Sequence, residues 1–254
     1  MIAVFVPVRL KSKRLKLKAL KKISNTESIK WCLNCSSQIK KIKRVFLLTS
    51  FLKKDDGLTK IKYKKGIKVF RGDPTDLFKR FLDAARKYKV KTIIRVTGDC
   101  PFISKEIMNY LLKSHLKKKA DYTAAKKYAV GTSGEIINVM ALENLYKKIK
   151  DRSFSEYMPF YFLNNQNLFK INIVNLPRKY VRGYRLTLDY AEDLKMFNFL
   201  VKKLIDLKLE INLKNIFRIL DQNKKIAKIN EKKKLVYKSK VFIKKIKKFT
   251  KLTS

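Results

Sequence analysis

Apolar stretches of strand length alternate with amphipathic helical stretches along most of the chain, and this alternation constrains the fold more than any other feature. Strands that follow one another through helices are typical of a parallel sheet covered on both faces. We therefore expect an α/β fold with three layers, α/β/α, around a mostly parallel sheet. The expected strands are 2–8, 44–50, 67–72, 92–99, 169–176 and 184–189, and the expected helices lie near 27–40, 75–88, 104–117, 141–149, 155–164, 190–205 and 212–223.

The chain is long and apolar enough to form one main domain, since 46% of its 254 residues are hydrophobic. We assign this domain to residues 1–230 and a basic, Lys-rich tail to residues 231–254. The stretch 236–252 could form a basic amphipathic helix that touches acidic lipid or a partner, but a solvated tail is the preferred interpretation. No apolar run has the roughly 18 residues of a membrane span, so we expect a cytoplasmic protein without a transmembrane segment.

The formal net charge of +43 would suit nucleic acid, an anionic membrane surface or acidic substrates. However, the cations are spread over almost every segment, and Lys outnumbers Arg by about four to one, whereas base readout favours Arg. We therefore expect no specific nucleic-acid partner. A basic nucleic-acid-binding protein remains an alternative from another functional class.

Three cysteines and a single histidine leave little scope for disulfides or for a metal site built from thiols. Cys32 and Cys35 form a C-x-x-C pair inside an expected helix, and Cys100 follows an expected strand. We expect all three thiols to be free, with the helical pair buried.

Charged side chains gather where expected parallel strands end, which is where open α/β sheets place ligand sites. Asp99 and Asp189 each end an apolar strand, and two such carboxylates could converge on one magnesium ion. Residues 9–20 follow the first strand with six Lys and Arg, cations that can neutralise phosphates. Arg71 lies at another strand end. Neither the G-x-G-x-x-G nor the Walker pattern is present.

These segments resemble sugar-activating cytidylyltransferases, most closely the branch of the spore-coat polysaccharide biosynthesis protein F. The family is also related to the synthetases of CMP-sialic acid and CMP-Kdo. The resemblance extends from Ile2 to about Asn230. It is carried by VPVRLKSKRLKLKAL (6–20), VFRGDPTDLFKRFLDAARKY (69–88), RVTGDCPFISKEIMNYLL (95–112), SEYMPFYFLNNQNLFKI (155–171) and RLTLDYAEDLKMF (185–197).

The resemblance implies a nucleotide-diphospho-sugar transferase (Rossmann-like) fold and a reaction between CTP and a sugar that releases pyrophosphate. It implies that Asp99 and Asp189 bind Mg²⁺ and that Arg71 lies near the base. The triphosphate would be held by Arg9, Ser12, Arg14 and Lys18. Among these, Lys18, Arg14 and Asp99 would take part in catalysis, and Glu135 would bind the sugar, for which an ulosonic acid is expected. Distant relatives often form dimers, which implies a homodimer.

The chain departs from its relatives at three places. Val8 replaces an Ala, Lys16 and Leu17 stand where many relatives carry Pro-Gly, and Tyr157 stands where many have His. No general base for the sugar hydroxyl can be named from the residues. A non-catalytic family member acting in a glycan pathway is a further alternative, which the presence of both carboxylates disfavours.

Overall fold

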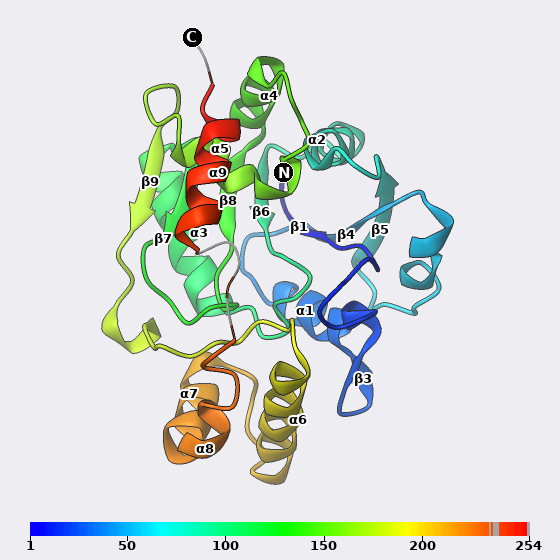
Figure 1. Cartoon of the computed structure of the whole chain (residues 1–254), viewed down its shortest axis with the longest axis vertical. Helices are drawn as coiled ribbons and strands as arrows, with labels where there is room; N and C mark the ends of the chain where they lie inside the picture. Colours follow the sequence, from blue (N-terminus) through cyan, green and yellow to red (C-terminus); the bar gives the residue numbers. More distant parts are fainter. Residues whose placement is uncertain (234, 236–238, 253–254) are drawn as a thin grey trace.

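The computed structural model describes residues 1–233, 235 and 239–252, and a seven-stranded sheet forms its centre (Figure 1). The strand order is β5-β4-β1-β6-β8-β7-β9. All neighbouring pairs are parallel except those that β8 makes with β6 and β7. The bounds are β1 (Ile2–Pro7), β4 (Arg44–Ser50), β5 (Ile67–Gly72), β6 (Thr92–Arg95), β7 (Tyr122–Ala125), β8 (Glu135–Asn138) and β9 (Ile171–Val174), and a small hairpin joins β2 (Lys22–Ile23) to β3 (Thr26–Glu27).

Helices cover both faces of this sheet, which confirms the expected three layers (Figure 1). One hydrophobic core lies beneath α1 (Ser28–Ser36), α3 (Lys105–Lys118), α6 (Ala191–Asp206) and α7 (Leu213–Gln222). The other lies beneath α2 (Leu77–Lys87), α4 (Val139–Lys148) and α5 (Met158–Leu163). Shorter elements are α8 (Lys224–Ala227), η1 (Lys18–Leu20), η2 (Lys53–Leu58), η3 (Ser155–Tyr157) and η4 (Arg178–Tyr180).

Strand β1 shows why the central strands are continuous apolar runs. Val4 and Val6 enter the core beneath α1, while Ala3 and Phe5 enter the core beneath α2. All four side chains are fully buried because successive residues of a strand point to opposite faces and both faces are covered.

Polar caps begin the helices close to the expected positions. The Asp76 carboxylate accepts from the backbone N–H of Lys79 at the start of α2, and the Ser104 hydroxyl accepts from Ile107 at the start of α3. These side chains satisfy backbone donors that have no partner within the helix.

The segment 184–189 is not a strand, and the expectation of one there was wrong. It forms a single parallel bridge, between Val130 and Arg185. Its backbone donors are instead used by neighbouring loops, with Leu186 N–H bonded to the Val130 carbonyl at 2.6 Å and Leu188 N–H to the Asp99 carbonyl at 2.8 Å. The expected strand 92–99 likewise ends at Arg95, and β7 and β8 were not anticipated.

The C-terminal helix α9 (Lys240–Thr250) packs against α5, so the expected solvated tail was wrong for these residues (Figure 1). Phe249 stacks on Phe154 with ring centroids 4.3 Å apart, and the Asn165 amide donates to the Thr250 carbonyl at 2.8 Å. Residues 236–238 of the expected basic helix lie outside the described residues. The division into a domain at 1–230 and a tail at 231–254 stays a prediction. No helix among the described residues is long and apolar enough to cross a membrane.

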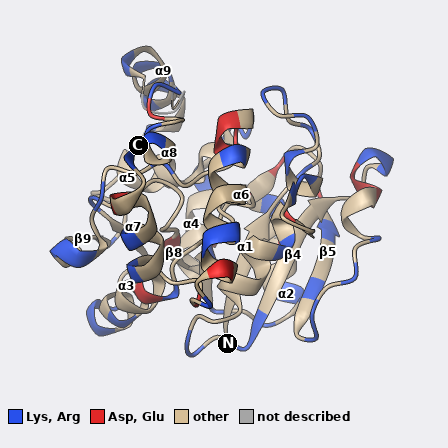
Figure 2. Cartoon of the chain, turned by 90° about the horizontal axis from the view of Figure 1, so that it is seen from below, with Lys and Arg blue, Asp and Glu red and all other residues tan. Residues whose placement is uncertain are grey.

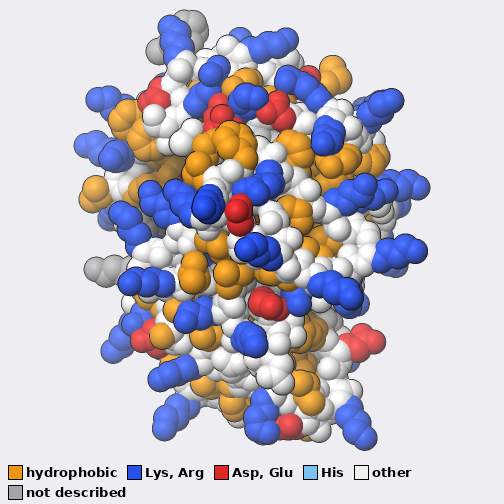
Figure 3. Space-filling model, turned by 90° about the vertical axis from the view of Figure 1, so that its right-hand side faces the viewer, with side chains coloured by type: hydrophobic (Ala, Val, Ile, Leu, Met, Phe, Trp, Pro, Cys, Tyr) orange, Lys and Arg blue, Asp and Glu red, His pale blue; other side chains and the backbone are white. Residues whose placement is uncertain are grey.

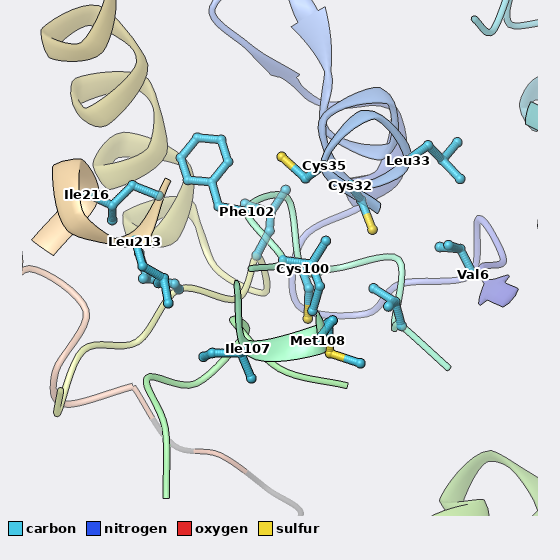
Figure 4. Close-up of a cluster of buried hydrophobic side chains, with 14 of the residues drawn as sticks. Val6, Cys32, Leu33, Cys35, Cys100, Phe102, Ile107, Met108, Leu213 and Ile216 are labelled. Atoms are coloured by element: carbon cyan, nitrogen blue, oxygen red, sulfur yellow. The ribbon is translucent and has the colours of Figure 1, made fainter. Parts of the chain in front are cut away.

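Cys32 and Cys35 project from α1 into the core beside Cys100 and Phe102, as Figure 4 shows. All three cysteines are free and buried, which confirms the expectation of buried thiols in a helix. Burial raises the pKa of each thiol, in the case of Cys35 to about 12. Reactive cysteines need the thiolate form, so these side chains serve packing.

Candidate active site

The side chain of Lys18 joins the two carboxylates that the sequence singled out. Its Nζ lies 2.7 Å from Asp99 Oδ2 and 2.8 Å from Asp189 Oδ1. Lys18 opens η1 after the loop that follows β1, whereas the two acids come from segments 90 residues apart in the chain. A single ammonium group therefore closes a site beside the carboxyl ends of the neighbouring strands β1 and β6, of which β6 precedes Asp99 in the chain.

Backbone hydrogen bonds bring Asp99 and Asp189 together. The Asp99 carbonyl accepts from Leu188 N–H at 2.8 Å and from the Thr187 hydroxyl at 3.1 Å. The fully buried Asp193 carboxylate accepts from the N–H groups of Asp189 and Tyr190, at 2.8 and 2.9 Å. These bonds fix the turn before α6, so that the Asp189 carboxylate faces the Lys18 ammonium.

Two arginines complete the charge balance around Asp189. Arg14 Nη2 lies 2.6 Å from Asp189 Oδ1, and Arg185 Nη2 lies 3.2 Å from Asp189 Oδ2. Arg185 also contacts Asp193, at 3.0 Å from its Nε to Oδ1. Both oxygens of Asp189 are thus engaged by cations, and its side chain is only 9% exposed.

The ionised forms of this cluster stabilise one another. Burial lowers the pKa of the Lys18 ammonium, but its contacts with Asp99 and Asp189 outweigh burial and raise this pKa above its ordinary value. Burial would raise the pKa of Asp189, whereas Lys18 and Arg14 hold it below its ordinary value. Both groups are therefore charged at neutral pH.

The donor set suits a hard divalent cation that also binds phosphate. Carboxylate oxygens are the ligands that Mg²⁺ prefers, usually one or two from the protein with the rest from substrate phosphates and water. Asp99 and Asp189 already share one cation, the Lys18 ammonium, which demonstrates that the fold aims both carboxylates at a single positive charge. The described residues contain no cluster of three or more His, Cys, Asp or Glu side chains, so a metal here would need substrate oxygens to complete its coordination.

Of the other residues expected to bind nucleotide, three lie apart from the Lys18 cluster. Arg9 donates to the Pro74 carbonyl at 2.6 Å and pairs with Glu156. Arg71 pairs with Asp56 at 2.6 Å beside the carboxyl ends of β4 and β5. Ser12 lies in the loop between β1 and η1, and among the described residues its side chain makes no hydrogen bond with Asp99 or Asp189.

Glu135 also has a partner of its own. It begins β8 opposite Arg95 of β6, and the ion pair between them measures 2.8 Å from Arg95 Nη1 to Glu135 Oε2. Arg95 is 6% exposed and also donates to the Glu156 carbonyl at 3.4 Å. This pair joins the sheet to η3, the element that contains Tyr157.

Sequence reasoning missed three residues that shape the site. Arg185 and Asp193 support Asp189, and their spacing of four residues on either side of it was a usable signal. Asp55 is fully buried, accepts from the Leu10 N–H at 2.8 Å and bonds the Ser50 hydroxyl, so it anchors the loop after β1. No local pattern distinguishes Asp55 from Asp56, its partly exposed neighbour in η2.

Outside this cluster, Lys and Arg are distributed over the whole molecule. Blue segments appear on nearly every element in Figure 2, and Figure 3 shows them scattered over the entire visible face with few acids among them. On these views the positive charge forms no single stripe.

Comparison with known proteins places the chain among nucleotide-transferring enzymes. A family model described as cytidylyltransferase matches residues 3–246. An uncharacterized protein of Methanocaldococcus jannaschii is 32% identical over 226 residues, which are 89% of this chain and 92% of that protein. The spore coat polysaccharide biosynthesis protein SpsF of Bacillus subtilis is 29% identical over 159 residues, 62% of this chain and 66% of SpsF.

Solved structures share the fold. A cytidylyltransferase from Leptospira borgpetersenii has a TM-score of 0.80 and 27% identity, covering 89% of this chain and 96% of that one. CMP:2-keto-3-deoxy-manno-octonic acid synthetase complexed with CTP has a TM-score of 0.62 and 14% identity, covering 80% and 98%. A Mycobacterium tuberculosis protein in complex with manganese has a TM-score of 0.56 and 11% identity, covering 78% and 97%.

Proposed function

The chain belongs to the cytidylyltransferase family and is a CTP-dependent nucleotidyltransferase, and from this premise we propose that it transfers CMP from CTP to a sugar, releases pyrophosphate and serves surface glycan biosynthesis. This proposal rests mainly on one observation, which is that Asp99 and Asp189 converge on one cation beside the loop after β1. The glycan role is supported by SpsF, whose name assigns it to spore coat polysaccharide biosynthesis.

The residues of the cluster can neutralise the charge that develops during this transfer. A sugar hydroxyl forms a bond to the α-phosphorus of CTP, the bond to the bridging oxygen breaks, and pyrophosphate leaves with the electron pair. Such a transfer depends mainly on positioning and on charge stabilisation. Lys18 and Arg14 would bind oxygens of the triphosphate, and Asp99 and Asp189 would hold Mg²⁺, which supplies further positive charge against the phosphate oxygens. The hydroxyl proton leaves to a base that the present contacts do not assign.

We propose further nucleotide contacts for Arg9, Ser12 and Arg71, which lie on or near the loop after β1 and the carboxyl ends of β4 and β5. Because Arg9 and Arg71 are paired with Glu156 and Asp56, binding would require these pairs to exchange for nucleotide oxygens. Partly exposed ion pairs cost little to exchange, which makes both arginines available to an incoming anion.

For the acceptor we propose an acidic sugar of the ulosonic type, with Glu135 contacting its hydroxyl groups. Two facts support this choice. The synthetase that shares the fold is named for an ulosonic acid, and Glu135 is held by Arg95 next to η3, on the sheet beyond β6. We also propose that the enzyme works in the cytoplasm as a homodimer, without a specific nucleic-acid partner.

A thermal-shift screen of the four nucleoside triphosphates, each with and without Mg²⁺, tests the proposed nucleotide. A ligand that binds only the folded state must stabilise it, so CTP with Mg²⁺ should raise the melting temperature more than ATP, GTP or UTP. A larger shift with another triphosphate would contradict the assignment to CTP.

The metal ligands are tested by substituting Asp99→Asn and measuring pyrophosphate release in the presence of CTP, Mg²⁺ and an ulosonic acid. The amide keeps the shape of the carboxylate but loses its charge, so we expect turnover to fall about 100-fold or more, the scale on which removal of one electrostatic contact acts. The matched control is Asp206→Asn on the exposed side of α6, which should retain full turnover and the same circular dichroism spectrum. Equal activity of the two variants would refute the role of Asp99.

A further inference from the structure

The Lys18 ammonium occupies the space between the two carboxylates proposed to bind the metal. It is bonded to one oxygen of each, at 2.7 and 2.8 Å, and its side chain is 20% exposed. A divalent cation held by the same two carboxylates would have to lie in that space, next to a positive charge. Because two cations at such short range repel each other strongly in a partly buried site, Lys18 and the metal cannot both hold this position.

The local backbone allows the side chain to leave without disturbing the fold. The Lys18 carbonyl accepts from the Ser28 hydroxyl at 2.8 Å, and the next residue, Ala19, is buried at 2% exposure. These contacts anchor the main chain of η1, whereas the four methylenes of the lysine can rotate. The ammonium can therefore move while its Cα stays in place.

The remaining cations keep the carboxylates supported after such a movement. Asp189 retains Arg14 and Arg185, at 2.6 and 3.2 Å. Asp99 has no second cation among the described ion pairs, so its carboxylate is the one that loses its only positive partner when Lys18 leaves. Departure of Lys18 thus creates a site that attracts a new cation.

On the basis of the proposed function, we propose that Lys18 is a stand-in for the metal, which means that its ammonium takes the place of the metal between Asp99 and Asp189. Without nucleotide it neutralises Asp99 and Asp189 and excludes free divalent cations. When a triphosphate arrives, its negative charge draws the ammonium away and both carboxylates become available to the metal. Nucleotide and metal then bind with positive coupling, which by linkage must be equal in both directions. The enzyme consequently takes up its metal together with CTP and not before it.

The proposal is tested by titrating nucleotide-free protein with Mn²⁺ and following the loss of the free-ion signal by electron paramagnetic resonance. Lys18→Met keeps a flexible, unbranched side chain, one heavy atom shorter, and removes its charge. We expect this variant to bind Mn²⁺ about tenfold or more tightly than the wild type when CTP is absent, within the usual range of such couplings. Lys16→Met, which removes a neighbouring exposed charge, should bind like the wild type.

Two further variants make every outcome decisive. Lys18→Met combined with Asp99→Asn should lose the gain, which locates the new Mn²⁺ at the carboxylates. If Lys18→Met does not fold by circular dichroism, Lys18→Gln replaces it, because a polar amide can still bond both acids without excluding a cation by charge. The stand-in role is overturned if the folded variant binds Mn²⁺ no more tightly than the wild type. Loss of turnover in Asp99→Asn would in that case leave the proposed function intact, whereas absence of any CTP binding by the wild type would overturn the proposed function itself.

Discussion

At the scale of single residues, Leu17 occupies a backbone position that would suit glycine. Its backbone angles are φ 52° and ψ 34°, in the left-handed region. The family resemblance implies Gly at this place, and Gly adopts that conformation without steric cost. The leucine side chain is 49% exposed, so little burial compensates for the strain. The loop therefore keeps the backbone shape suited to glycine even though the glycine is absent.

Leu17→Gly should consequently raise the free energy of unfolding by about 0.5–1 kcal/mol, because relief of the left-handed strain outweighs the added freedom of the unfolded chain. Urea unfolding monitored by tryptophan fluorescence measures the change. Lys16→Gly is the control, since Lys16 has no positive φ and should be destabilised by the same substitution. A lower stability of Leu17→Gly would indicate that the leucine side chain contributes packing.

At the scale of elements, α3, β7 and β9 meet at a buried polar contact. His115 of α3 shares a hydrogen bond of 2.9 Å with the Thr123 hydroxyl of β7, which also accepts from the Asn172 amide of β9 at 3.3 Å. The imidazole is 3% exposed, and burial lowers its pKa to about 4. The folded protein thus holds this ring neutral at a pH where the unfolded chain protonates it.

The lowered pKa of His115 predicts how stability depends on pH. The unfolded state binds a proton below about pH 6.5, whereas the folded state does not until about pH 4, so stability falls as the pH decreases through this window. Between about pH 7 and 5 the loss from this residue should be about 2 kcal/mol. Urea unfolding curves recorded at several pH values measure this loss. The variant His115→Gln should not show it. An identical pH dependence in the variant and the wild type would exclude His115 as its source.

At the scale of the whole molecule, the net charge of +43 is spread over the whole surface. The chain nevertheless belongs to a family of enzymes. The cations lie on nearly every element (Figure 2). Asp189 contacts Lys18 of η1, Arg14 of the loop before it and Arg185 of the segment before α6. Such a surface attracts polyanions through counterion release without reading their sequence. Excess charge of this kind does not require a nucleic-acid function.

Binding to single-stranded RNA should therefore be non-specific and sensitive to salt, with an affinity that falls about 100-fold or more between about 50 and 200 mM salt. Fluorescence anisotropy with RNAs of different sequence measures this dependence, and the CTP-induced thermal shift at about 200 mM salt should be unaffected by added RNA. Tight, sequence-dependent binding at about 150 mM salt would instead support the nucleic-acid alternative.

The sequence by itself determined the layered α/β architecture and the segments that carry the site. Continuous apolar runs such as β1 and β4 coincide with the expected strands, and α2, α3 and α7 lie within a residue or two of their expected bounds. These features depend on local periodicity and on capping residues, which neighbouring positions specify. The family motifs likewise identified Asp99, Asp189, Arg14 and Lys18, which the structure brings into one cluster.

Only the tertiary structure decided which charged side chains form ion pairs with one another. Lys16 and Lys18 are indistinguishable by composition, yet Lys18 alone bridges the two carboxylates, while Arg9 pairs with Glu156 on η3. The short β7 and β8 and the packing of α9 were missed for the same reason. Their stability comes from partners distant in the chain, such as Ile171 beside Tyr122 and Phe154 beneath Phe249, and no local pattern encodes such partners.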